Sequence, residues 1–295
     1  MAEALFGEDF LRRLEMLRLA LVRSAGSQAD GLRLAGPSGG TGEFRDHRDY
    51  AFGDEPRYID WNLYGRLEKL YLKEFTPEHE GRALVLLDTS ASMTAGQKFD
   101  YARRLAAAVS YLASAGGDRL ALVAFNSQRA VSLSPRPGPS GMYETLEFIA
   151  SLKPGGSTGY RSGAERGAEA AAGRGRGAAL WISDFWVEPG EWQDSASLSS
   201  RGFDSSLIRV LSGAELTPRT SGPLVLVDSE SGERLRVAGG EASARAFEVA
   251  AGEHAAALAS FARRHRCRLL TARTSEPFED SALRLLRGGR LVEAG

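Results

Sequence analysis

The stretch ALVLLDTSASM, residues 83–93, restricts the fold more than any other part of the chain. The run Ala83–Leu87 is entirely apolar, and a strand that is apolar on both faces is typical of a parallel sheet covered by helices on each side. The run ends in Asp88, and hydroxyls follow at Ser90 and Ser92. Ligands bind beyond the carboxyl ends of the strands in such sheets. We therefore expect Asp88 to face a crevice at the sheet edge.

The rest of the chain from residue 81 alternates apolar strands with amphipathic helices. Strands are expected at Ala83–Leu87, Leu120–Phe125, Gln128–Leu133, Ala178–Ile182, Leu207–Leu211 and Arg268–Thr271. Helices are expected at Lys98–Ala115, Pro139–Leu152, Ser162–Ala172 and Phe247–His265. This order predicts an α/β fold, a Rossmann-like doubly wound sheet that is mainly parallel.

Other segments depart from this alternation. Pro223–Val237 has two alternating runs around Ser-Gly-Glu and predicts an inserted β-hairpin, whereas Trp186–Ser206 is interpreted as a surface connection. Upstream, an amphipathic helix is expected at Asp9–Ser24, a loop at Gly36–Gly42 and a half-buried strand at Lys69–Phe75. We expect residues 1–80 to form an N-terminal helical and extended segment packed on a main α/β domain of residues 81–295.

Composition and charge exclude several classes of protein. The apolar fraction of 43% and the charged fraction of 25% are those of a soluble globular protein. A net charge of -1 provides no overall field toward nucleic acid or an anionic membrane. No run approaches the roughly 18 apolar residues of a membrane span, and the N-terminus lacks the features of a signal peptide. We therefore expect a cytoplasmic protein with no nucleic-acid partner and no membrane insertion.

Asp88, Ser90 and Ser92 form the first part of a candidate metal site. A carboxylate and two hydroxyls on one tight loop supply the hard oxygen ligands that Mg²⁺ prefers. The same residue types also cap loops and helix starts, and both interpretations fit this stretch. Two further segments favour a metal site: the Gly-rich loop 154–160, which contains Thr158, and the strand that ends at Asp184. In a doubly wound sheet these segments can converge on the first.

Together these residues resemble the metal-ion-dependent adhesion site of the von Willebrand factor type A (vWA) domain. The three segments are present in that family's order. The resemblance implies that Ser90, Ser92 and Thr158 contact the metal directly, that Asp88 and Asp184 act directly or through water, and that an Asp or Glu from a partner completes the shell. The loop departs from the family's pattern because Ser157 precedes Thr158, and Thr158 is preferred as the ligand. The metal is expected to be Mg²⁺, with Mn²⁺ as the alternative.

A second resemblance covers nearly the whole chain. The segments Gly42–Phe44, Arg48–Trp61, Val210–Leu216 and Leu226–Glu233, together with Arg66, resemble the bacterial domain-of-unknown-function family 58 (DUF58). That family is commonly encoded beside AAA+ ATPases of the MoxR type. The resemblance therefore implies an adaptor or co-chaperone that works with a MoxR-type ATPase.

The block Arg45–Phe75 is dense in arginine, aspartate and aromatic residues. We interpret it as structural, because paired Arg and Asp side chains organise a fold more often than they react. The expected buried ion-pair network consists of Arg48, Asp54, Arg57, Asp60 and Arg66, with Tyr58 and Trp61 as apolar anchors.

Three functions are compatible with these observations. The favoured hypothesis is a Mg²⁺-dependent protein-binding module without catalytic activity. The second is a structural scaffold whose metal site does not function. The third is a metal-dependent phosphohydrolase with Asp88 as nucleophile. The third is disfavoured because phosphatases of the haloacid-dehalogenase type have a second acid where this chain has Ser90.

Overall fold

The computed structural model describes residues 10, 12–16, 32–33, 43–51, 54, 56, 59–76, 82–172, 177–216, 222–288 and 293–294. The chain divides into two compact units: a larger unit of residues 1–37 and 81–295, and a smaller unit of residues 38–80. One division between the units falls between residues 80 and 81. Residues 1–37 group with the larger unit instead of with 38–80, because Phe10 and Leu14 lie in its hydrophobic core.

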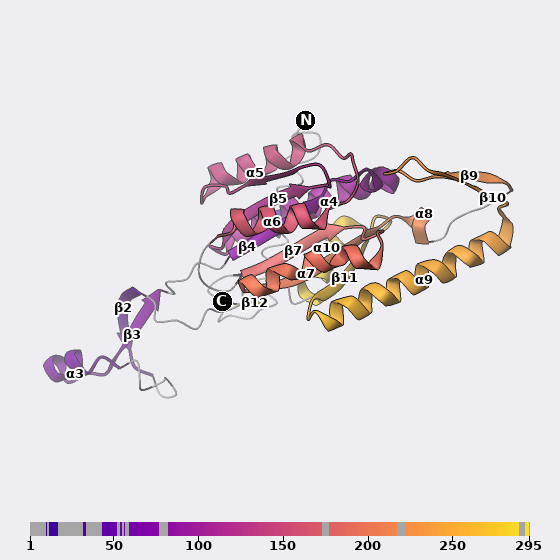
Figure 1. Cartoon of the computed structure of the whole chain (residues 1–295). Helices are drawn as coiled ribbons and strands as arrows, with labels where there is room; N and C mark the ends of the chain where they lie inside the picture. Colours follow the sequence, from indigo (N-terminus) through magenta and orange to yellow (C-terminus); the bar gives the residue numbers. More distant parts are fainter. Residues whose placement is uncertain are drawn as a thin grey trace. The chain divides into compact units, whose positions relative to one another are not determined.

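The larger unit is built on a six-stranded sheet with the order β11-β8-β7-β4-β5-β6 (Figure 1). Its strands are β4 (Arg82–Asp88), β5 (Arg119–Phe125), β6 (Ala130–Leu133), β7 (Gly177–Ser183), β8 (Phe203–Leu211) and β11 (Arg268–Arg273). All neighbours are parallel except β6, which pairs antiparallel with β5. The expectation of an α/β, Rossmann-like, mainly parallel sheet is therefore confirmed.

Successive residues of β4 face two different hydrophobic cores. Val85 and Leu87 lie in the core that also contains residues of α4, whereas Leu84 and Leu86 lie in the core that contains Trp181. The helices are α4 (Lys98–Ala115), α5 (Pro139–Ser151), α6 (Tyr160–Ala170), α7 (Gln193–Ala196), α8 (Gly213–Leu216), α9 (Gly240–Arg264) and α10 (Phe278–Gly288). Because both faces of β4 are buried, its sequence shows no alternation of polar and apolar residues before Asp88.

The expected hairpin is confirmed: β9 (Leu224–Val227) and β10 (Arg234–Val237) pair antiparallel. It precedes α9, the long helix at the right of the view (Figure 1). Val225, Val227 and Leu235 are more than half exposed, so the hairpin strands bury little of their apolar surface. α9 begins at Gly240 rather than at Phe247, because its first half is rich in alanine and glutamate, which favour helix without an apolar stripe.

Two further segments differ from expectation. The segment expected as a surface connection contains the 3₁₀-helices η3 (Pro189–Trp192) and η4 (Ser197–Arg201) with α7 between them. Trp192 and Leu198 are buried there, so isolated apolar residues among serines anchor it. The short pair β1 (Leu32–Arg33) and β12 (Glu293–Ala294) was not predicted. The expected loop Gly36–Gly42 and most of the expected helix Asp9–Ser24 lie outside the described residues.

The smaller unit contains the antiparallel pair β2 (Glu43–Asp49) and β3 (Tyr71–Thr76), and α3 (Trp61–Leu67) lies between the two strands in the chain (Figure 1). Asp60 caps α3 by accepting hydrogen bonds from the backbone N–H groups of Asn62 and Leu63. Arg48 makes a two-pronged ion pair with Asp54, with both N–O distances at 2.7 Å.

The expected burial of the ion-pair network is wrong for the described residues. The side chain of Arg48 is 45% exposed, and Trp61 is 62% exposed rather than an anchor. Asp60 pairs with His47, while Arg66 is exposed and Arg57 and Tyr58 lie outside the described residues. A unit of this length has too few apolar residues to enclose a polar network.

A search of the described helices found none with both the length and the apolar character that a membrane crossing requires.

Helix α6 approaches the sheet closely at Gly163. A Cβ atom there would lie 2.8 Å from Cγ of Phe125 and 3.1 Å from Cζ3 of Trp181. We expect Gly163→Ala to lower the free energy of unfolding by about 1–3 kcal/mol, because the added methyl group would overpack the core. Gly252→Ala in α9 is the control: nothing lies within 4 Å, and alanine should stabilise by about 0.5–1 kcal/mol. Equal effects in urea denaturation would contradict this packing.

Candidate functional site

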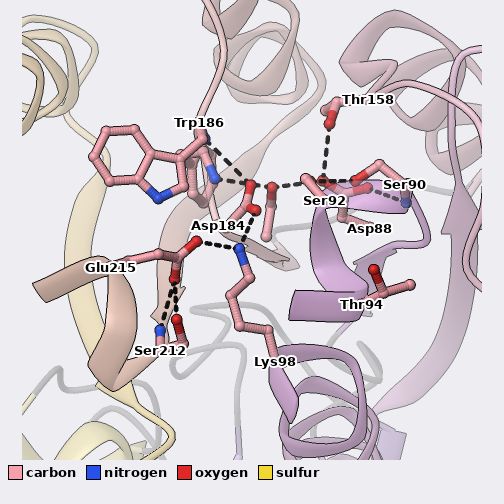
Figure 2. Close-up of polar contacts among 12 residues, drawn as sticks. Asp88, Ser90, Ser92, Thr94, Lys98, Thr158, Asp184, Trp186, Ser212 and Glu215 are labelled. Carbon is pink, nitrogen blue, oxygen red and sulfur yellow. Dashed lines mark hydrogen bonds and ion pairs between the residues drawn. The ribbon is translucent and has the colours of Figure 1, made fainter. Parts of the chain in front are cut away.

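The carboxylate of Asp88 lies at the centre of the candidate site, at the end of β4 between β5 and β7 (Figure 2). Asp88 is fully buried. Its Oδ1 accepts a hydrogen bond from the backbone N–H of Ser90 at 2.8 Å, and its Oδ2 accepts one from the hydroxyl of Ser183 at 2.6 Å. The register, which places Leu87 opposite Ile182, brings Ser183 beside Asp88. Both donors are neutral, so they do not cancel the charge of the carboxylate.

Burial raises the pKa of Asp88 from 3.8 to about 7. The largest cause is desolvation, followed by the charge of Asp184, and hydrogen bonds from Ser183 and Ser90 oppose the rise. A carboxylate with a raised pKa is one whose negative charge lacks compensation. The site therefore favours a proton or a metal cation near Asp88.

The three hydroxyls selected from the sequence lie in the two loops next to this carboxylate. The Oγ atoms of Ser90 and Ser92 are 3.0 Å apart, and the hydroxyl of Thr158 lies 3.5 Å from Oδ2 of Asp88. The loop 154–160, which contains Thr158, is held against the serine loop, which contains Ser90 and Ser92. The backbone N–H of Ala91 donates to the carbonyl of Gly156, and that of Gly155 donates to the carbonyl of Thr89, both at 2.8 Å. Thr158, the residue preferred to Ser157 on sequence grounds, thus has its hydroxyl beside Asp88.

Asp184 lies at the same sheet edge but is held by a buried cation. Its Oδ2 is 2.7 Å from Nζ of Lys98, and both side chains are 1% exposed. Nζ of Lys98 also lies 2.5 Å from Oε1 of Glu215, whose Oε2 accepts hydrogen bonds from the backbone N–H and hydroxyl of Ser212 (Figure 2). The charge of Asp184 is therefore compensated within the chain. Asp184 therefore differs from Asp88, whose hydrogen-bond donors among the described residues are neutral.

Sequence reasoning missed four residues of this constellation: Lys98, Ser183, Glu215 and Glu230, the last of which accepts a hydrogen bond from the Thr158 hydroxyl at 3.0 Å. Lys98 was expected only as the first residue of a helix, because nothing in a sequence distinguishes a buried lysine from a solvated one. Ser183 precedes Asp184 directly, so its position at a strand end was a usable signal. Glu215 and Glu230 lie in the two later segments that resemble DUF58, although no role followed from that resemblance.

The donor atoms fit a hard divalent cation. Mg²⁺ has metal–oxygen distances of 2.0–2.1 Å in an octahedron, so neighbouring ligand oxygens are about 2.9 Å apart. The separation of 3.0 Å between the Ser90 and Ser92 oxygens matches this spacing. Within the described residues, no group of three or more His, Cys, Asp or Glu side chains is arranged to hold a metal. The candidate set selected from the sequence thus consists of three neutral hydroxyls and the carboxylates of Asp88 and Asp184.

A hollow of about 410 Å³ lies beside the serine loop. Its lining includes Thr94, Asp100, Arg103 and Lys153. None of the five candidate metal residues lines it, so it is distinct from the site.

The first prediction for the site concerns the buried lysine. Replacing Lys98 by methionine leaves Asp184 buried without its cation. We expect Lys98→Met to lower the free energy of unfolding by about 3–5 kcal/mol. Lys153→Met, at an exposed lysine, should change it by less than about 0.5 kcal/mol. The double variant Lys98→Met with Asp184→Asn should recover part of the loss, and failure of urea denaturation to show this recovery would contradict the pairing.

The second prediction concerns pH. Folded Asp88 keeps its proton up to about pH 7, whereas the unfolded chain loses it near 3.8. Between these values the folded state binds more protons, so a rise in pH favours unfolding. In the metal-free protein, the contribution of Asp88 to stability should fall from about pH 4 to pH 7 and stay constant above that. Asp88→Asn should lack this decline, and parallel stability curves for the two proteins would show that the pKa of Asp88 is not raised.

Relatives and solved structures were compared with this chain. Residues 46–257 match the family described as "Protein of unknown function DUF58". The uncharacterized proteins Rv1480 of Mycobacterium tuberculosis and Mb1516 of Mycobacterium bovis are each 28% identical to it over 263 residues, which cover 87% of this chain and 81% of theirs.

Solved structures with a similar fold are distant in sequence. BatB, a conserved hypothetical protein from Bacteroides thetaiotaomicron, is 15% identical over 71% of this chain and 98% of its own, with a TM-score of 0.46. The SpRpn10 VWA domain is 12% identical over 70% of this chain and 94% of its own, with a TM-score of 0.40. A von Willebrand factor type A structure from Catenulispora acidiphila is 15% identical over 48% of this chain and 35% of its own, with a TM-score of 0.39. Because the family match extends over most of the chain, the protein belongs to the DUF58 family.

Proposed function

We propose that this protein is a metal-dependent protein-binding module that recognises an acidic side chain of its partner. The observation that supports the proposal best is the state of Asp88. Its carboxylate is fully buried, and its hydrogen-bond partners among the described residues are all neutral. A buried charge of this kind is costly unless a cation balances it. A divalent cation beside the hydroxyls would supply that balance.

Asp88, Ser90, Ser92 and Thr158 would hold the ion, and Asp184 would support it from behind. A bound Mg²⁺ provides a positive centre that attracts an anionic oxygen from outside. Three of the four holding side chains are neutral hydroxyls, so they leave most of the charge of the ion uncompensated. An Asp or Glu of a partner is therefore the expected external ligand. Mn²⁺ is the alternative metal, since it accepts the same oxygens.

The resemblance of the chain to DUF58 proteins adds a proposed partner. We infer a role as adaptor or co-chaperone for a MoxR-type AAA+ ATPase in the cytoplasm. Binding is favoured over catalysis because the position two residues after Asp88 is Ser90, which cannot serve as the second acid of a phosphohydrolase. The role of the chain would thus be to present a surface, not to transform a substrate.

One observation favours a structural scaffold as the second candidate. Lys98 already compensates Asp184 and Glu215 within the fold, so part of the site is balanced without a metal. In that case loss of Asp88 would change stability but no interaction. Metal binding and partner binding therefore have to be measured separately.

The metal-binding prediction can be tested by calorimetry. Asp88→Ala, and the pair Ser90→Ala with Ser92→Ala, should weaken Mg²⁺ binding by at least about 100-fold, which exceeds the loss from an outer contact. Thr94→Ala is the control, because Thr94 lies in the same loop with its hydroxyl donated to the carbonyl of Ala91. Circular dichroism should show an intact fold in each variant. Wild-type affinity in both site variants would refute the metal site.

Affinity capture from a native lysate in Mg²⁺ provides the second arm of this test. Wild type and Asp88→Ala are compared without a chelator, because a chelator would also disable an ATPase that needs Mg-ATP. An AAA+ ATPase captured by the wild type alone supports the module. Identical captured proteins would show that the metal site is not the interface and would favour the scaffold.

A further inference from the structure

A glutamate of this same chain reaches the candidate site. Oε2 of Glu230 accepts a hydrogen bond from the backbone N–H of Thr158 at 3.0 Å, and Oε1 accepts one from its hydroxyl, also at 3.0 Å. The hydroxyl has one proton, and Asp88 lies farther away at 3.5 Å, so the proton points to Glu230. Glu230 therefore approaches Thr158 on both its backbone and its side chain.

The turn that contains Glu230 is built to present it. Glu230 lies between β9 and β10, at the tip of the hairpin. Oδ1 of Asp228 accepts hydrogen bonds from the backbone N–H groups of Glu230 and Ser231, at 2.9 and 2.6 Å, and from the hydroxyl of Ser231 at 2.9 Å. These bonds lower the pKa of Asp228 and keep it ionised. Gly232 closes the turn at φ +74°, a conformation that glycine adopts readily.

The remainder of the hairpin is weakly held by burial. Val225 is 52%, Val227 57% and Leu235 63% exposed, so its strands gain little from the hydrophobic core. A segment with few buried apolar contacts opens at low free-energy cost. The hairpin therefore combines a hydrogen-bonded tip with strands that are weakly held by burial.

The charges at the tip favour a cation. Glu230 and Asp88 are both within hydrogen-bonding reach of the Thr158 hydroxyl, and in the described part of the chain their hydrogen bonds come from neutral groups. The Lys98 ammonium is engaged by Asp184 and Glu215 instead. The separation of 3.0 Å between Oε1 of Glu230 and Oγ1 of Thr158 is also close to the spacing of neighbouring ligand oxygens around Mg²⁺.

We propose that Glu230 is an internal ligand of this site: its carboxylate takes, within the chain, the place of the partner's Asp or Glu. The inference rests on the proposed metal-dependent binding. An acidic partner then has to displace the hairpin tip, so the hairpin limits access to the metal. A carboxylate that is already tethered competes at high effective concentration, and therefore only a partner with additional contacts would replace it.

The test uses the full chain, with Mn²⁺ as the metal and acetate as the carboxylate. Glu230→Ala is compared with Glu233→Ala, which removes the same charge from an exposed residue of the same turn. The number of exchangeable waters on Mn²⁺ is measured by water proton relaxation, and acetate binding by titration of the Mn²⁺-loaded protein. Glu230→Ala should gain coordinated water, because the carboxylate that occupies a position on the metal is gone. It should also bind acetate at least about tenfold more tightly than wild type, because acetate no longer has to displace the charged Glu230 side chain. Glu233→Ala should behave as wild type.

Unchanged hydration and acetate affinity in Glu230→Ala would overturn the inference. If Mn²⁺ still binds wild type but not Asp88→Ala, the proposed function stands and only the internal ligand is wrong. If Mn²⁺ does not bind wild type, both are wrong. Glu230→Gln, which keeps the size of the side chain, replaces Glu230→Ala if thermal unfolding shows that the alanine variant is disturbed, and the same water gain is expected from it.

Discussion

The burial of two carboxylates at the ends of neighbouring parallel strands is the constraint on which the rest of the site depends. Asp88 ends β4, and Asp184 directly follows β7, which pairs with β4. Two like charges that are near each other and removed from water make ionisation more costly, and the charge of Asp184 raises the pKa of Asp88. Lys98, the first residue of α4, compensates the charge of Asp184. Asp88 receives only neutral hydrogen bonds, and this asymmetry identifies where an external cation would be stabilised.

The lysine also links the site to the elements around it. Through Lys98, α4 is connected to Asp184 at the end of β7 and to Glu215 in α8 (Figure 2). A buried ion pair of this kind stabilises little overall, since desolvation offsets most of the attraction. Its clear effect is local: the ammonium of Lys98 compensates the carboxylates of Asp184 and Glu215, whereas Asp88 has no such partner among the described residues.

The inserted hairpin adds another carboxylate, that of Glu230, beside the hydroxyl of Thr158. Glu230 meets Thr158, and Thr158 meets Asp88, so the threonine lies between an acid of the sheet and an acid of the insertion. The sheet therefore contributes Asp88 to the site, while the hairpin contributes the carboxylate of Glu230. If the site binds a metal, the chain itself contains the kind of group that an acidic partner would offer.

Much of the larger unit follows from local sequence. The apolar runs that became β4, β5 and β7 are buried on both faces, and such runs have few alternatives to a covered parallel strand. The start of α4 at Lys98 and its end at Ala115 follow from helical periodicity and the glycines after it. Asp88, Ser90, Ser92 and Thr158 could be selected because strand ends on one edge of such a sheet meet at a known place. The short helices between Pro189 and Arg201 could not be predicted from the sequence, because their few apolar residues show no helical periodicity.

The sequence by itself therefore determined the α/β architecture, the DUF58 resemblance and the group of candidate oxygen ligands at the sheet edge. Only the tertiary structure decided how the charges are paired: that Lys98 compensates Asp184, and that Glu230 turns toward Thr158. The physical reason is distance along the chain. Lys98 and Asp184 are 86 residues apart, and Thr158 and Glu230 are 72 apart. Periodicity reports on neighbours within a turn or a strand, whereas the pairing of buried charges depends on which surfaces the fold brings together.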